Sequence, residues 1–256
     1  MPTDNFCVDD RFGRFWERFH PNVPTFDGKT VLEIGCGAGH RSFEAAAHGA
    51  SRVVGLDPYE PSISKARAHL LTVPMADRER VTFFLGTLQM LPPEKFDLII
   101  SEDTLEHVLD VPELLAEIRN RLNPGGQFYL GFGPLYHAFD GDHGWMRAVL
   151  PGRRMFPWPW GHLLLEGYAF RKLSKIHGKR VTNTRDWPYL TLNQHALSEY
   201  QEMFRQSGLR IVSCRVNYAT SLKGRLFNSL RHLPGLSRYF TNNIYMILDA
   251  GDLRSN

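Results

Sequence analysis

The feature that most constrains the fold is a glycine-rich turn that follows directly on a short apolar strand. Residues 30–34 have the sequence Thr-Val-Leu-Glu-Ile, and residues 35–39 have the sequence Gly-Cys-Gly-Ala-Gly. Glycines permit positive φ angles, and they leave backbone N–H groups unshielded, so that a ligand can lie against them. The sequence therefore predicts a ligand site at the turn between a strand and a helix.

Short apolar strands alternate with helices along the chain. This alternation indicates crossover connections and ligands bound beyond the carboxyl ends of the strands. The expected fold is α/β and doubly wound, with a mainly parallel seven-stranded sheet whose last strand is antiparallel. The expected strands are residues 30–34, 52–56, 81–85, 96–101, 127–132, 209–216 and 243–248. The expected helices are residues 40–49, 61–71, 111–122 and 195–207.

Two segments interrupt this alternation. The longer one is rich in Pro, Gly, Trp and His and shows no regular period, which is typical of a functional insertion. Aromatic residues at the N-terminus recur at helical spacing and predict a helical cap. The chain is accordingly divided into a cap at 1–28, a core at 29–132, a loop-rich and helical insertion at 133–192, and a completion of the core at 193–256 with a second insertion at 218–242.

The spacing of charged residues around the turn indicates a nucleoside ligand without a pyrophosphate. Asp57 stands at the tip of the second predicted strand, where a carboxylate can accept two hydrogen bonds from a ribose diol. The glycines follow the pattern G-x-G-x-G instead of the dinucleotide pattern G-x-G-x-x-G. Glu33, two residues before the turn, would repel a pyrophosphate and favour a cationic group such as an ammonium.

Three further segments, together with the glycine-rich turn, match the motifs of one enzyme family. They are Phe96–Ser101, the segment Leu105-Glu106-His107-Val108, and the turn Leu122-Asn123-Pro124-Gly125-Gly126. With the glycine turn, they make the chain resemble the class I S-adenosylmethionine-dependent methyltransferases over roughly residues 28–132, 194–217 and 243–248. The resemblance implies a methyltransferase with S-adenosylmethionine as cofactor and with the first insertion as a substrate lid.

The resemblance also implies cofactor contacts. The turn glycines would pass the methionine and ribose, Glu33 would lie near the ammonium, Asp57 would hold the ribose hydroxyls, and Pro58 and Tyr59 would flank the adenine. The chain departs from the family where Gly86-Thr87-Leu88 replaces Gly-Asp-Ala, so backbone groups there would contact the adenine. The expected cofactor-binding residues are Glu33, Gly35, Cys36, Gly37, Gly39, Asp57, Pro58, Thr87, Leu88, Ser101 and His107.

A hydroxyl acceptor calls for a general base, because its pKa far exceeds 7. The octet 136–143 holds two histidines among carboxylates, and His137 or His143 is the expected base. Glu102 is a further catalytic candidate. Two alternatives for the octet stay open, a Mg²⁺ site made of carboxylates and a plain turn with surface histidines. No metal is expected among the site residues.

The expected acceptor site lies in the basic half of the chain. Residues 1–144 carry 13 Lys and Arg against 21 Asp and Glu, whereas residues 145–248 carry 16 against four. Basic residues between aromatic ones suit an acceptor with a ring body and an anionic group. The expected substrate-binding residues are Tyr136, Arg153, Arg154, Trp158 and Trp160.

The predicted function is in-line methyl transfer to an oxygen of a small, anionic or glycosylated metabolite, as in natural-product biosynthesis. Alternatives are N- or C-methylation without a base, an RNA or lipid-linked acceptor, and a non-catalytic cofactor-binding subunit. A small-molecule partner is expected and nucleic acid is not, because no RNA-binding module is recognised and Ser101–Thr104 differs from the family's RNA-directed tetrapeptide.

A cytoplasmic location is expected. No stretch approaches the roughly 18 apolar residues that a membrane span needs, and the acidic N-terminus does not resemble a signal peptide. Three widely spaced cysteines, Cys7, Cys36 and Cys214, do not form a disulfide framework. Peripheral membrane contact through the basic segment 222–236 and the oligomeric state stay open.

Overall fold

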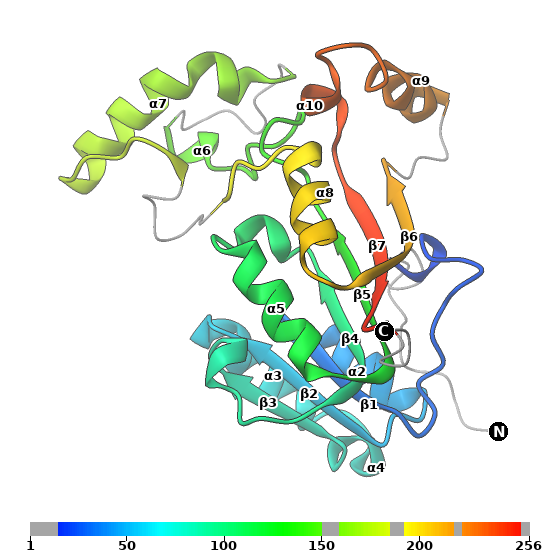
Figure 1. The fold of residues 1–256 in the computed structure, drawn as a ribbon. Coiled ribbons are helices and arrows are strands. Elements are labelled where there is room, and N and C mark those ends of the chain that lie inside the picture. The colour runs from blue at the N-terminus through cyan, green and yellow to red at the C-terminus, as the bar shows by residue number, and fades with distance from the viewer. Residues whose placement is uncertain (1–14, 150–158, 185–191, 218–221, 252–256) are drawn as a thin grey trace.

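Seven strands form a single mixed sheet in the order β3-β2-β1-β4-β5-β7-β6 (Figure 1). The computed structural model describes residues 15–149, 159–184, 192–217 and 222–251. β7 is antiparallel to both its neighbours, and the other pairs are parallel, which confirms the predicted fold class. The strands are β1 (Thr30–Ile34), β2 (Arg52–Asp57), β3 (Val81–Leu85), β4 (Phe96–Glu102), β5 (Leu122–Phe132), β6 (Arg210–Val216) and β7 (Ile244–Asp249).

Four helices of the core lie close to their predicted positions. They are α2 (His40–Ala47), α3 (Glu60–Leu70), α5 (Val111–Arg121) and α8 (Leu197–Gln206). The short helix α4 (Met75–Arg78) and the 3₁₀ turns η1 (Leu88–Met90) and η2 (Leu105–His107) were not predicted. Asp110 caps α5, because its carboxylate accepts the backbone N–H of Glu113 at 2.9 Å. The observed ends of the predicted strands and helices lie within two residues of their expected positions, except that β5 begins at Leu122 and not at residue 127.

The core has two layers because successive residues of each strand point to opposite faces of the sheet. Leu32 of β1 packs in one apolar cluster with residues of α5 and α8. Its neighbour Val31 packs on the other face with α2, α3 and the aromatic residues of the N-terminal segment. In that segment Phe15, Trp16 and Phe19 are buried, and their rings meet edge-on or tilted.

The first insertion contains a long helix where the sequence showed no regular period. α7 (Gly161–His177) runs for 17 residues and buries Ala169, Phe170 and Leu173. These residues join a third apolar cluster with the short helix α6 (Met146–Val149). Helical structure was expected in this insertion, but the helix was not located because Gly161 and Gly167 lower helix propensity, although Gly178, at φ +66°, marks the helix end.

The two insertions gather beyond the end of β5 (Figure 1). The second insertion carries α9 (Leu222–Leu230) and α10 (Ser237–Phe240). The segments meet where the N–H of Leu135 donates to the carbonyl of Asn242 at 2.7 Å. The domain boundaries drawn from the sequence stay predictions. Among the described residues, no helix has the length and apolar composition needed to cross a bilayer.

Candidate functional site

The glycine-rich turn joins β1 to α2 in a left-handed backbone conformation. Gly37 has φ +53° and Gly39 has φ +85°. A Cβ atom on Gly39 would lie 2.4 Å from the ring of Phe83, whereas one on Gly37 would meet no described atom within 4 Å. Packing therefore requires a glycine at position 39, and the backbone of Gly37 borders open space that a ligand can fill.

Asp57 lies at the carboxyl end of β2, directly beside this turn. Its carboxylate accepts the backbone N–H of Gly37 at 3.0 Å and that of Tyr59 at 2.8 Å. These bonds fix the orientation of the carboxylate, and a carboxylate with two acceptor oxygens has lone pairs left for two further donors. The adjacent Pro58 and Tyr59 are exposed.

Glu33 is turned into the interior of the protein, toward the start of α2. Its carboxylate is buried and accepts both the N–H of Ser42 at 2.7 Å and the hydroxyl of Ser42 at 2.5 Å. Burial raises the pKa of Glu33 from 4.5 to about 7, although the bonds to Ser42 act in the opposite direction. In this structure the side chain thus connects β1 to the first turn of α2.

Three further residues that were expected to bind the cofactor are buried in the core. Cys36, Leu88 and Ser101 are buried, and the hydroxyl of Ser101 donates to the carbonyl of Ile34 at 3.2 Å. Leu88 belongs to the apolar core, so a ligand can contact it only through its backbone. Thr87 is exposed beside it.

Glu102 is held in an ion pair that the sequence did not suggest. Arg41 is only 3% exposed, and its Nε donates to Glu102 at 2.9 Å while its Nη1 donates to Glu44 at 2.7 Å. The guanidinium also lies 4.6 Å from the centre of the Phe15 ring. The carboxylate of Glu102 is thus engaged by a buried arginine, and it is not among the residues that line the cavity between the two insertions.

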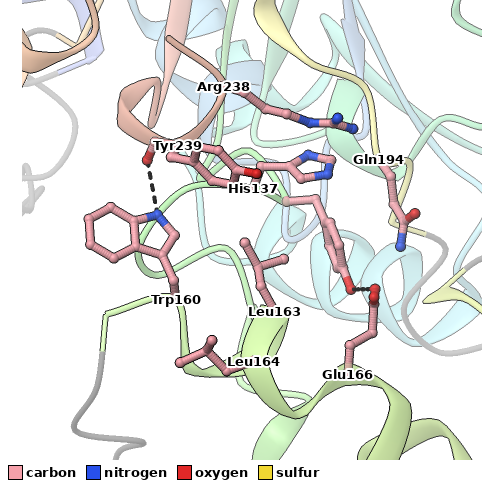
Figure 2. A pocket seen from close by; sticks show the side chains of 9 residues that line it. His137, Trp160, Leu163, Leu164, Glu166, Gln194, Arg238 and Tyr239 are labelled. Atoms are coloured by element: carbon pink, nitrogen blue, oxygen red, sulfur yellow. Dashed lines mark hydrogen bonds between the residues drawn. The ribbon is translucent and has the colours of Figure 1, made fainter. Parts of the chain in front are cut away.

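A cavity of about 400 Å³ lies where the two insertions meet. Figure 2 shows its wall, made by the segment after β5, the start of α7, the segment before α8, and α10. The wall is aromatic and aliphatic, with a few polar groups that converge on the cavity. The lining residues are Tyr136, His137, Trp160, Leu163, Leu164, Glu166, Gln194, Arg238 and Tyr239.

His137 is the candidate base that lines this cavity. Its Nδ1 is buried and has no hydrogen-bond partner among the described residues, which leaves Nε2 as the accessible ring nitrogen. Burial, aided by the charge of Arg238, lowers the pKa of His137 from 6.5 to about 4. The imidazole is therefore neutral at pH 7 and has a lone pair for a proton, but this low pKa makes it a weaker base than an exposed histidine.

Two hydrogen bonds hold the wall of the cavity together. The hydroxyl of Tyr136 donates to Glu166 at 2.5 Å. The indole N–H of Trp160 donates to the carbonyl of Tyr239 at 3.1 Å, and this bond joins the first insertion to the second. Tyr136 and Trp160, two of the expected substrate-binding residues, line this cavity. The other three, Arg153, Arg154 and Trp158, lie outside the described residues.

Sequence reasoning missed Glu166, Gln194, Arg238 and Tyr239 as lining residues. Glu166 is the only acid between residues 145 and 185, and this isolation is the one signal that could have marked it. Arg238 and Tyr239 belong to a segment far away in sequence, and no local pattern relates them to Tyr136.

The second candidate base, His143, does not line the cavity. Its Nε2 donates to the carbonyl of Pro134 at 2.7 Å, and its ring meets that of His107 edge-on at a centroid distance of 5.3 Å. Burial lowers the pKa of His143. The structure therefore separates the two histidines of the octet into different surroundings.

Curated relatives carry names that state a tRNA acceptor. The chain is 32% identical over 140 residues to a tRNA U34 carboxymethyltransferase of Idiomarina loihiensis, which covers 54% of this chain and 42% of the relative. It is also 32% identical over 115 residues to the protein of that name from Haemophilus influenzae, covering 45% and 36%. The chain thus spans about two fifths of the length of these relatives.

These relatives overturn the expectation that nucleic acid is not a partner. That expectation was wrong because it depended on the lack of a recognised RNA-binding module and of one tetrapeptide, and neither is required for RNA to act as an acceptor. The names also indicate tRNA modification, so natural-product biosynthesis has no support from them.

A solved structure with a similar fold and a matching family model are both those of methyltransferases. A solved S-adenosylmethionine-dependent methyltransferase from Mesorhizobium loti superimposes with a TM-score of 0.57 at 22% identity, over 93% of this chain and 96% of that one. A family model described as a methyltransferase domain matches residues 8–214, which is most of the chain. The chain therefore belongs to the class I S-adenosylmethionine-dependent methyltransferases.

Proposed function

We propose that the enzyme transfers the methyl group of S-adenosylmethionine in line to a hydroxyl oxygen of an acceptor held in the aromatic cavity. The sulfonium is already activated, so the protein has to align oxygen, methyl carbon and sulfur and to exclude water. The observation that carries this proposal is the position of the His137 imidazole in the wall of the cavity.

The cofactor would lie against the β1–α2 turn. The open space at Gly37 accommodates its methionine and ribose, and the carboxylate of Asp57 accepts hydrogen bonds from the ribose hydroxyls. Exposed Pro58 and Tyr59 would flank the adenine. Glu33 would support the cofactor site indirectly, because its hydrogen bond to Ser42 holds the start of α2 against β1 on either side of the turn.

His137 would accept the proton of the acceptor hydroxyl. As the oxygen forms its bond to the methyl carbon, the carbon–sulfur bond breaks and its electron pair stays on sulfur. The hydroxyl proton passes to Nε2 of His137, so that the products are a methyl ether, S-adenosylhomocysteine and an imidazolium. General-base help of this kind contributes typically 10²–10⁴-fold to the rate.

The lining of the cavity suits a hydroxylated ring that carries an anionic group, such as a sugar derivative. Trp160 and Tyr239 offer aromatic faces for stacking, and Arg238 offers a cation on the same wall. The hydrogen bond between Tyr136 and Glu166 makes one side of the cavity rigid.

A second candidate acceptor is tRNA. The names of the curated relatives favour it, and so does the excess of 16 Lys and Arg over four Asp and Glu in residues 145–248. Phosphates are neutralised by such cations, and unstacked bases lie on aromatic side chains. Binding to RNA would then weaken steeply as salt is raised, because counterions are released.

Methyl-labelled S-adenosylmethionine tests both candidates. The wild-type enzyme and His137→Ala are incubated with an acid-soluble extract and with total tRNA from cells that lack the enzyme. A labelled methyl ether of an acid-soluble ring compound supports the first candidate, and label in tRNA selects the second. Transfer that His137→Ala leaves unchanged would contradict the base and favour N- or C-methylation. No label in either fraction, with S-adenosylmethionine bound, would refute both acceptors.

A further inference from the structure

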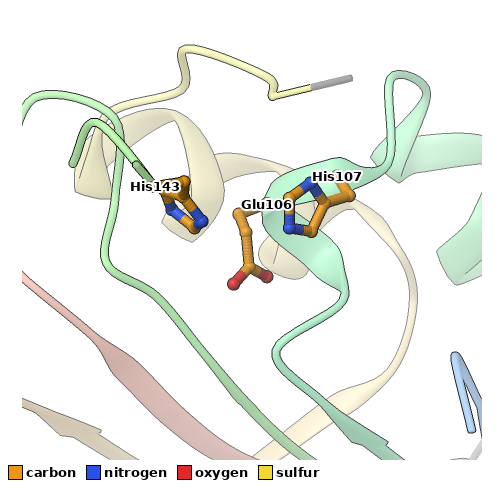
Figure 3. A group of neighbouring side chains, drawn as sticks. All are labelled: Glu106, His107 and His143. Atoms are coloured by element: carbon orange, nitrogen blue, oxygen red, sulfur yellow. The ribbon is translucent and has the colours of Figure 1, made fainter. Parts of the chain in front are cut away.

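Three side chains with metal-binding atoms meet at the junction of the core and the first insertion. Glu106 and His107 belong to η2, directly after β4, and His143 comes from the first insertion. One nitrogen or oxygen atom from each lies within 4.8 Å of the others. Figure 3 shows the side chain of Glu106 between the two imidazole rings.

The carboxylate of Glu106 has an oxygen without a partner. The side chain is 1% exposed, and one oxygen accepts the backbone N–H of Gly133 at 3.2 Å. The other oxygen, Oε2, is buried and has no hydrogen-bond partner within the part of the chain that the structure describes. Because buried polar atoms in folded proteins are nearly always partnered, this oxygen points to a missing ligand.

The tautomer of His143 suits a metal ligand. Its Nε2 lies 2.7 Å from the carbonyl oxygen of Pro134. A carbonyl only accepts, so Nε2 carries the proton and Nδ1 keeps its lone pair. Metal-binding histidines almost always donate their other ring N–H to a carbonyl or carboxylate in this way, which fixes the tautomer and the ring orientation.

From these contacts we propose that Glu106, His107 and His143 bind a first-row divalent transition-metal ion. Two imidazoles and one carboxylate suit Zn²⁺, Mn²⁺, Fe²⁺ or Co²⁺ better than Mg²⁺ or Ca²⁺, which prefer oxygen ligands only. With bonds of about 2.1 Å, the ligand atoms would draw together by roughly 1 Å. The ion would tie the first insertion to η2, and three protein ligands leave its remaining coordination positions to water.

This site differs from both expectations that the sequence raised. No metal was expected, and the alternative was a Mg²⁺ site made of the carboxylates of the octet. The structure instead joins one histidine of the octet to the Leu-Glu-His segment after β4. The site does not depend on which acceptor the enzyme uses.

Titration of chelator-treated protein with Co²⁺ tests the site, because bound Co²⁺ has visible absorption that depends on its ligands. We expect one Co²⁺ per chain in the wild type, with affinity at least about 100-fold lower in His143→Gln and in Glu106→Gln. Gln at position 106 keeps an acceptor for the N–H of Gly133. His232→Gln, which removes an exposed histidine, should bind Co²⁺ as the wild type does.

Three results would overturn the proposal. The first is no ligand-dependent absorption in the wild type at millimolar Co²⁺. The second is unchanged binding in His143→Gln, which decides the matter even if Glu106→Gln does not fold. The third is binding that disappears in His69→Gln instead, since the rings of His40 and His69 lie 6.1 Å apart and offer a competing surface pair.

Discussion

The β1–α2 turn, which we propose binds the cofactor (the cofactor end), and the cavity that we propose binds the acceptor (the acceptor cavity) are built in different ways. At the cofactor end, the ligand surface is backbone, shaped by glycines with positive φ and secured by buried side chains such as Glu33. In the acceptor cavity, the surface is side chains from four segments, joined by bonds such as that between Trp160 and Tyr239. We therefore expect glycine and Glu33 substitutions at the first end to act through the fold, and substitutions in the cavity to act on the acceptor.

His137→Ala should show the largest effect and separate the two regions. If His137 accepts the hydroxyl proton, kcat falls by about 10²–10⁴-fold, while the affinity for S-adenosylmethionine stays unchanged. Steady-state kinetics and calorimetry measure the two quantities. A parallel loss of cofactor affinity would mean that the two regions are not separate.

Gly39→Ala should destabilise the cofactor end. The new Cβ would lie 2.4 Å from the Phe83 ring at a φ of +85°, so we expect a loss of about 2 to 5 kcal/mol in the free energy of unfolding. Gly37→Ala is the matched control, because its Cβ meets open space and only the positive φ costs about 1 to 2 kcal/mol. Equal losses in urea denaturation would show that the packing against Phe83 is not the cause.

Glu33 should make the stability of the cofactor end depend on pH. Folding raises its pKa from 4.5 to about 7, so the folded state binds the proton more tightly than the unfolded state. The contribution of Glu33 is most favourable below pH 4.5 and declines as the pH rises through about 7, by about 3 kcal/mol in all. Glu33→Gln should lack this decline, and parallel stability profiles of the two proteins would contradict the shift.

Tyr136→Phe should have the smallest effect and should act on the acceptor cavity alone. The lost hydrogen bond to Glu166 is worth about 1 kcal/mol, since water can replace the hydroxyl at the half-buried carboxylate. We expect the KM of the acceptor to rise a few-fold with the cofactor affinity unchanged. An altered affinity for S-adenosylmethionine would place Tyr136 at the cofactor end.

The sequence could predict the cofactor end because its constraints are local. A strand, three glycines and an acid at the next strand tip determine the backbone path, and this pattern lies within residues 30–57. The alternation of strands and helices also predicted the mainly parallel sheet, because parallel neighbours need crossover connections. The order of the strands was not predicted. The ion pair of Arg41 was missed, because a helical arginine usually lies at the surface.

The acceptor cavity could not be predicted, because its contacts join segments far apart in sequence. Tyr136 and Trp160 were expected to bind the acceptor, but their partners Glu166 and Tyr239 come from α7 and α10. His137 and His143 look equivalent in the octet, and only the folded chain turns one into the cavity and the other toward Glu106.

Calorimetric titration with S-adenosylmethionine tests the division between the two regions most directly. Asp57→Ala removes the carboxylate beside the turn, and we expect affinity about 100-fold lower, as for the loss of one or two hydrogen bonds to a charged group. His137→Ala and the exposed-acid control Glu79→Ala should bind as the wild type does. Wild-type affinity in a folded Asp57→Ala, or weak binding by His137→Ala, would contradict the assignment of the cofactor to the β1–α2 turn.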